Sequence, residues 1–175
     1  MGKIMDNRYI LIFFIIIVCV FNLFLVSEYS DVIGTASVDV SKYTFSLPKD
    51  FILLETTDQN SILITNTKSG LDIAFSVISD KYSSNFKLNE LENDSSYSVL
   101  SNGTINSGDV SIESIYYKHI NSNNNNKSDA AIFYFNKNNA SFKVRMENFN
   151  YELQRNETID SLSYIVDSLR INYKR

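Results

Sequence analysis

The feature that most constrains this chain is an uncharged apolar run near its N-terminus. From Ile10 to Val26 the run holds seventeen residues, and Asn22 is its one polar side chain. A helix of this length is about 26 Å long at ~1.5 Å per residue, close to the ~30 Å hydrocarbon core of a bilayer. Tyr9 and Tyr29 flank the run, and tyrosine is enriched at membrane interfaces. The run therefore predicts a transmembrane helix over residues 10–26 that contacts the lipid bilayer.

The charges on either side of the run predict its orientation. Lys3 and Arg8 precede it, and no Lys or Arg follows it until Lys42. Basic residues stay on the cytoplasmic side of a membrane helix. We therefore expect four segments in a single-pass protein of the cell membrane: a cytoplasmic stub at residues 1–9, the membrane helix at 10–26, a tether at 27–37 and an extracytoplasmic domain at 38–175.

An alternative interpretation is a cleaved signal peptide. Gly34-Thr35-Ala36 is a small-x-small triplet, so cleavage after Ala36 stays open. The apolar run is longer than a usual signal core and ends ten residues before Ala36, which favours a retained anchor. Cys19, the one cysteine, lies inside the run, so the exported part has no thiol for a disulfide or a zinc site.

The exported part has the length of one domain and a mild acidic charge. The whole chain has a net charge of −4, and neither sign forms a block. This charge distribution gives no indication of nucleic-acid binding. The exported part is therefore expected to be held together by its hydrophobic core and to have no nucleic-acid partner.

Alternating and β-branched segments predict a sheet. Hairpin turns are expected at Lys68-Ser69-Gly70 and at Asn136 to Asn139, because glycine and asparagine tolerate left-handed backbone conformations. The segments that we expect to be strands are Tyr43 to Leu47, Phe51 to Glu55, Ser61 to Thr65, Leu71 to Ile78, Val110 to Ile120, Ala130 to Phe135 and Phe142 to Met146.

Two segments have helical spacing. The C-terminal one repeats apolar residues from Ile159 to Leu169 at intervals of three and four, with Asn156 as a candidate N-cap and Arg170 in the last turn. A second helix is expected between Lys87 and Leu100. Together the patterns predict an α+β fold in which a mainly antiparallel sheet packs with two helices.

This order of elements resembles the PsbP-like domains. The opening Tyr43-Thr44-Phe45-Ser46-Leu47-Pro48-Lys49-Asp50-Phe51 is similar to the strand, proline and aromatic entry of that family. The late hairpin and the final helix running into Asp167-Ser168-Leu169-Arg170-Ile171 are similar as well. The resemblance implies a compact α/β/α sandwich of the kind used by accessory proteins that bind other proteins. It brings no catalytic motif, and the absence of tryptophan departs from many members.

The residues give little support for catalysis. His119 is the one histidine, so neither a histidine-based triad nor a two-histidine metal site can be built, and its position in a predicted strand favours a structural role. We therefore predict no catalytic, cofactor-binding or metal-binding residues and no cofactor. The function expected is a non-catalytic, membrane-tethered domain that binds a protein of the cell envelope or of a membrane complex.

Two alternatives remain open. A carboxylate-based envelope hydrolase would need acidic residues that converge in a deep pocket. A receptor for a small apolar or lipid ligand would need a closed cavity. The segment from Asn102 to Asp109 could supply oxygen ligands to calcium, but it does not match the spacing of a calcium-binding loop, so we predict a plain turn there. The candidate residues are Glu90, Glu92, Asp94, Asp109 and Glu113 for the hydrolase and Phe75, Ile112 and Phe133 for the cavity.

Overall fold

The fold was analysed in a computed structural model, which describes residues 35–38, 42–54, 61–78, 84–120 and 129–171. The predicted stub, membrane helix and most of the tether lie outside these residues. Within the described ranges, no helix has the length and apolar character needed to cross a membrane.

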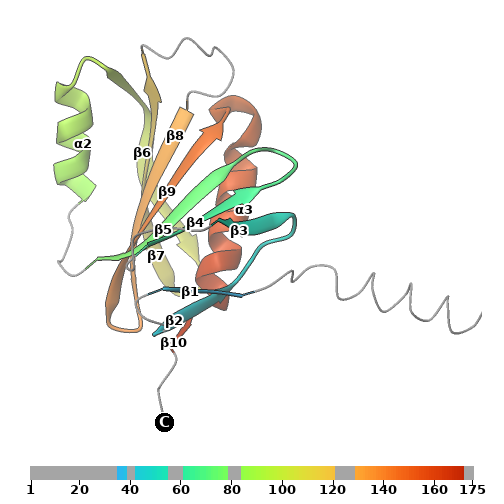
Figure 1. Cartoon of the computed structure of the whole chain (residues 1–175). Coiled ribbons are helices and arrows are strands. Elements are labelled where there is room, and N and C mark those ends of the chain that lie inside the picture. Colours follow the sequence, from blue (N-terminus) through green and yellow to red (C-terminus); the bar gives the residue numbers. More distant parts are fainter. Residues whose placement is uncertain (1–34, 39–41, 55–60, 79–83, 121–128, 172–175) are drawn as a thin grey trace, which may run out of the picture. The chain divides into compact units, whose positions relative to one another are not determined.

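Among the described residues, two antiparallel sheets and the helices α2 and α3 make up the fold (Figure 1). The larger sheet has seven strands in the order β3-β4-β5-β9-β8-β7-β6, and the smaller has three in the order β1-β2-β10. Helices α2 and α3 lie on opposite faces of the larger sheet. The strands are β1 Thr35–Val38, β2 Tyr43–Ser46, β3 Phe51–Leu54, β4 Ser61–Asn66, β5 Asp72–Ile78, β6 Tyr97–Ser107, β7 Val110–His119, β8 Asp129–Lys137, β9 Ala140–Phe149 and β10 Arg170–Ile171; the helices are α2 Ser84–Asn93 and α3 Tyr151–Ser168.

The main core lies between the larger sheet and α3. Strict alternation in β5 turns Ile73 and Phe75 toward α3, and both are fully buried. Phe75 packs against the rings of Phe45 and Phe142, with centroid distances of 4.8 and 5.4 Å. A smaller apolar cluster on the opposite face contains Leu91 of α2. The two clusters give the α/β/α layering that the PsbP-like resemblance implied.

Both predicted hairpin turns are confirmed. Asn138 and Asn139 have φ angles of 54° and 60°, the left-handed pair that a type I′ turn requires between β8 and β9. Gly70 has φ of 76° in the turn between β4 and β5. Asparagine and glycine hold these conformations at low cost, and the two turns therefore fix strand registers.

The prediction of a helix from Lys87 to Leu100 is wrong in its second half. Helix α2 ends at Asn93, and β6 begins at Tyr97. Tyr97 pairs with His119 on β7, and its ring lies 5.6 Å from that of Tyr117. Cross-strand packing of this kind outweighs the weak helical spacing of the segment.

The predicted turn from Asn102 to Asp109 is also largely strand. Strand β6 continues to Ser107, and the turn consists of Gly108 and Asp109. Gly108 has a φ of 56° and occupies the first central position of a type II′ hairpin turn, where a positive φ is required. The asparagine side chains of this segment are therefore spread along an extended strand.

The C-terminal helix is confirmed, with corrected ends. It begins at Tyr151, and the Asn150 side chain caps it by accepting a hydrogen bond from the backbone N–H of Leu153 at 3.2 Å. The predicted cap, Asn156, lies inside the helix. Arg170, expected in the last helical turn, lies in β10 opposite Thr44 because the small sheet pairs there.

Candidate functional site

The acidic residues that would serve a hydrolase do not converge. Glu90 and Glu92 are exposed on α2, and Asp109 is exposed in the β6–β7 turn. Glu90 forms an ion pair with Lys87 of the same helix at 2.5 Å. Among the described residues, no group of three or more His, Cys, Asp and Glu side chains is arranged to hold a metal ion. The deep carboxylate pocket that the hydrolase hypothesis needs is not assembled by these residues.

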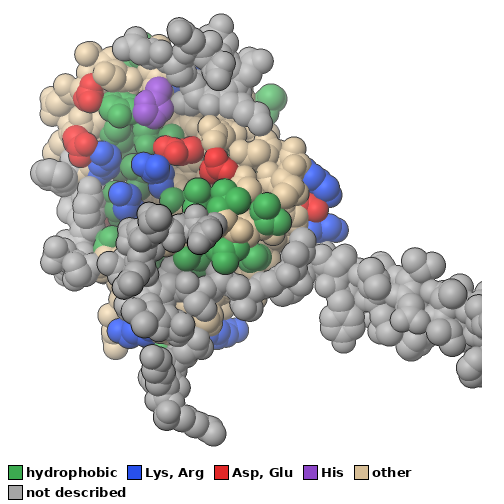
Figure 2. All heavy atoms as spheres, in the orientation of Figure 1, with side chains coloured by type: hydrophobic (Ala, Val, Ile, Leu, Met, Phe, Trp, Pro, Cys, Tyr) green, Lys and Arg blue, Asp and Glu red, His purple; other side chains and the backbone are tan. Residues whose placement is uncertain are grey.

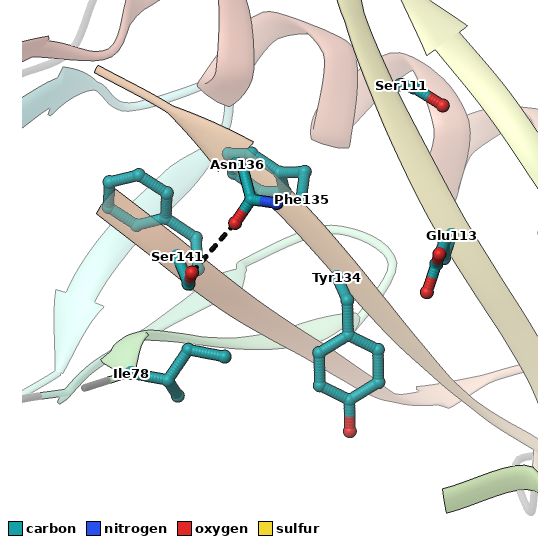
Figure 3. A pocket seen from close by; sticks show the side chains of 8 residues that line it. Ile78, Ser111, Glu113, Tyr134, Phe135, Asn136 and Ser141 are labelled. Carbon is teal, nitrogen blue, oxygen red and sulfur yellow. Dashed lines mark hydrogen bonds between the residues drawn. The ribbon is translucent and has the colours of Figure 1, made fainter. Parts of the chain in front are cut away.

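Among the described residues, Glu113 is a candidate carboxylate that lines surface hollows. Its side chain is exposed on β7 and lines two shallow hollows of about 210 and 260 Å³. The first lies over β8 and β9 and includes Tyr134 and Asn136 (Figure 3). The second lies between α2 and the β6–β7 hairpin. Among the described residues Glu113 has no ion-pair partner within 4 Å.

The register of three strands builds the first hollow. Tyr134 pairs with Glu113 on one side and with Lys143 on the other. At the end of the β8–β9 hairpin, the Ser141 hydroxyl donates a hydrogen bond to Asn136 Oδ1 at 2.7 Å (Figure 3). The hollow is therefore a polar groove around one carboxylate and one tyrosine ring, which is suited to recognising donor groups but has no histidine or second acid beside it.

His119 lies at the end of β7, away from this groove. Its ring is half-buried, with centroids 4.7 Å from the Tyr97 ring and 5.8 Å from the Tyr117 ring. This aromatic packing agrees with the structural role that its strand position favoured.

The residues proposed for a ligand cavity belong to the core. Phe75, Ile112 and Phe133 are fully buried, and the Phe133 ring packs edge-on against Tyr116 at 5.6 Å. All three lie in the main hydrophobic cluster, and none of them lines the hollows around Glu113.

A partly exposed apolar surface lies on the same sheet face as α2. Register places Leu54, Leu63 and Ala74 side by side across β3, β4 and β5, and Ile52 lies on the same face of β3. Ile52 is 44% exposed, and the other three are partly buried. Helix α2 packs on β6 and β7. We name Ile52, Leu54, Leu63 and Ala74 the open half-face; Figure 2 shows apolar side chains gathered there beside basic ones.

Charged groups border the open half-face. Arg145 lies next to Ala74 and forms an exposed ion pair with Glu147 at 3.3 Å. Burial lowers the pKa of the Lys143 ammonium, and the nearby Arg145 and Lys87 cations lower it further. An apolar centre with a charged rim is the usual composition of a protein-binding surface.

Tyr117 gives a pH-dependent stability that can be measured. Burial, and then the Glu147 carboxylate, raise its pKa to about 12. The folded state therefore keeps the phenol proton more tightly than the unfolded state, so this contribution is present below pH ~10 and is lost as pH rises toward ~12. Between pH ~10 and ~12, we therefore expect the unfolding free energy of the wild type to fall by about 2–3 kcal/mol more than that of the Tyr117→Phe variant.

Urea denaturation of the full chain in detergent, at a series of pH values from 8 to 12, measures this difference. Tyr164→Phe, at a half-buried position on α3, is the matched control. Parallel pH profiles for the wild type and Tyr117→Phe would show that the Tyr117 phenol has no altered proton affinity.

Comparison with known proteins identifies the fold. The sequence matches no family model and no curated protein. The structure aligns with the solution structure of the cyanobacterial PsbP protein CyanoP from Synechocystis with a TM-score of 0.50, covering 81% of this chain and 94% of that one at 10% identity. The fold is PsbP-like.

Two other solved structures are similar to this PsbP-like chain. One is a Bacteroides thetaiotaomicron protein, with a TM-score of 0.42, 10% identity and coverage of 80% of this chain and 48% of that one. The other is LpqN of Mycobacterium tuberculosis, described as involved in cell envelope biogenesis, with a TM-score of 0.44, 14% identity and coverage of 75% and 83%. At 10% identity, the likeness to CyanoP establishes the fold and nothing more.

Sequence reasoning missed both surfaces. Glu113 was a candidate, but its neighbours Tyr134 and Asn136 come from other strands and are brought to it by register. Phe51 to Glu55 was predicted to be a strand, but its pairing with β4, which brings the residues of the open half-face together, was not predicted. A signal was present nonetheless, because Pro48 and the short run are typical of an edge strand.

Proposed function

We propose that this protein is a membrane-tethered, extracytoplasmic domain that binds a protein of the cell envelope and catalyses no reaction. In this proposal residues 10–26 cross the bilayer, residues 1–9 stay in the cytoplasm, residues 27–37 form the tether and residues 38–175 form the exported domain. The run from Ile10 to Val26 is uncharged, and basic residues precede it, which supports the membrane helix and its orientation.

The open half-face supports the binding of a protein partner. Ile52 and its partly buried neighbours form an apolar surface on β3, β4 and β5, on the sheet face where α2 packs against β6 and β7. Removing such surface from water is worth about 25 cal/mol per Å², so an exposed apolar sheet face with a charged rim favours a docked partner. The PsbP-like fold brings no catalytic motif of its own, and the dispersed carboxylates give the hydrolase alternative no support.

Photo-crosslinking in intact membranes tests this proposal. A photo-reactive amino acid at position 52 is expected to give a protein adduct of defined mass. The same group at position 153 is the matched control, because Leu153 is 83% exposed on α3 and lies on the opposite side of the sheet. Equal yields from the two positions would show that the open half-face is not the binding surface.

A further inference from the structure

Strand β6 forms a long edge of the larger sheet. Among the described strands it pairs with β7 alone, and its eleven residues, Tyr97–Ser107, include no charged residue and no proline. Edge strands usually carry such residues because these prevent another chain from pairing. A bulge interrupts the register between Val99 and Ser101, but the pairing from Asn102 to Ser107 is continuous. This stretch has the features of a pairing template.

The type II′ turn determines which backbone groups point outward from β6. Ser107 and Val110 flank the turn and form the first hydrogen-bonded pair of the hairpin. Because the pattern alternates, the backbone N–H and C=O groups of Asn102, Thr104 and Asn106 point away from β7. Their side chains share the sheet face of Glu113. No atom lies within 4 Å of the position that a Cβ would take at Gly103, so the opposite sheet face has open space at this residue.

Glu113 lies one strand in from this edge. It is directly opposite Thr104, and the hollow of about 260 Å³ between α2 and the hairpin includes both residues. Neighbouring strands are ~4.8 Å apart, so a residue paired with Thr104 on an added strand would have its Cα roughly 10 Å from that of Glu113. A lysine or arginine side chain spans this distance, and it matches the charge of a carboxylate that has no ion-pair partner among the described residues.

We propose that the β6 edge binds an extended peptide segment as an added strand, and that Glu113 binds a lysine or arginine side chain of this segment opposite Thr104. The inference rests on the proposed function in that the segment belongs to a protein partner. It extends that function by naming a second contact, on the opposite edge of the sheet from the open half-face. A second copy of β6 does not fit, because β6 itself has no basic residue.

The test uses the full chain in detergent micelles and a fluorescent hexapeptide, acetyl-Thr-Val-Lys-Val-Thr-Val-amide, titrated by fluorescence anisotropy. We expect saturable binding, and weaker binding when glutamate replaces the peptide lysine. Glu113→Gln is expected to weaken binding of the lysine peptide about two- to fivefold, the range for a partly screened ion pair. Glu92→Gln, at an exposed position on α2, is the matched control and should leave binding unchanged.

A second arm leaves the protein untouched. N-methylation of the peptide amides along one edge should abolish binding, whereas N-methylation along the other edge should not, because only one edge pairs with β6. Equal effects of the two methylation patterns, or no effect of Glu113→Gln, would overturn the inference. This outcome is separable from the proposed function: crosslinking at position 52 does not involve β6, and peptide binding does not involve Ile52.

Discussion

The Phe75→Ala variant is expected to lose about 3–5 kcal/mol of unfolding free energy, which is the typical cost of truncating a buried phenylalanine. Phe75 is fully buried at the centre of β5, and its ring contacts those of Phe45, Phe135 and Phe142 at centroid distances between 4.8 and 6.4 Å. The variant therefore leaves a cavity between the larger sheet and α3. Such a loss is a large share of the stability of a typical domain.

Urea denaturation of the full chain measures this loss. Leu153→Ala is the control, since an 83% exposed side chain should change the unfolding free energy by less than about 0.5 kcal/mol. A loss below about 1 kcal/mol for Phe75→Ala would mean that the aromatic cluster is not the centre of the core.

The second large effect concerns the proposed membrane helix at residues 10–26. Deleting residues 10–26 is expected to move almost all of the protein from the membrane fraction to the aqueous fraction, because these residues supply the apolar length that a span requires. An unrelated uncharged apolar helix of equal length, placed at the same position, should restore membrane association. If the deletion variant still sediments with membranes, another part of the chain attaches the protein to the membrane.

The hairpins of this fold were predictable because local chemistry determines them. Asn138 and Asn139 adopt left-handed conformations at little cost, and the strands around them alternate clearly. The β6 segment was not predictable in the same way. Leu88 and Leu91 have helical spacing, and the polar residues after Tyr97 are compatible with a longer helix. The segment forms a strand because it pairs with β7, which is a non-local interaction.

The ends of α3 and the edge strand β3 show the same limit. Asn150 and Asn156 are both acceptable helix caps by sequence, and only the packed structure selects Asn150. Phe51, Ile52 and Leu53 form one apolar run, yet Phe51 is buried whereas Ile52 and Leu53 are 44% and 51% exposed. The sequence pattern predicts that this run is a strand, but it does not show whether the strand lies at the edge or in the centre of the sheet. The position of the strand in the sheet determines how exposed its side chains are.

We propose that an exported domain binds a protein partner through the open half-face. The most direct measurement combines photo-crosslinking from position 52 in intact cells with later digestion by an external protease, and identifies the adduct by mass spectrometry. We expect one recurring envelope protein in an adduct that the protease degrades. Recovery of lipid adducts alone, or of a protein adduct that the external protease leaves intact, would contradict it.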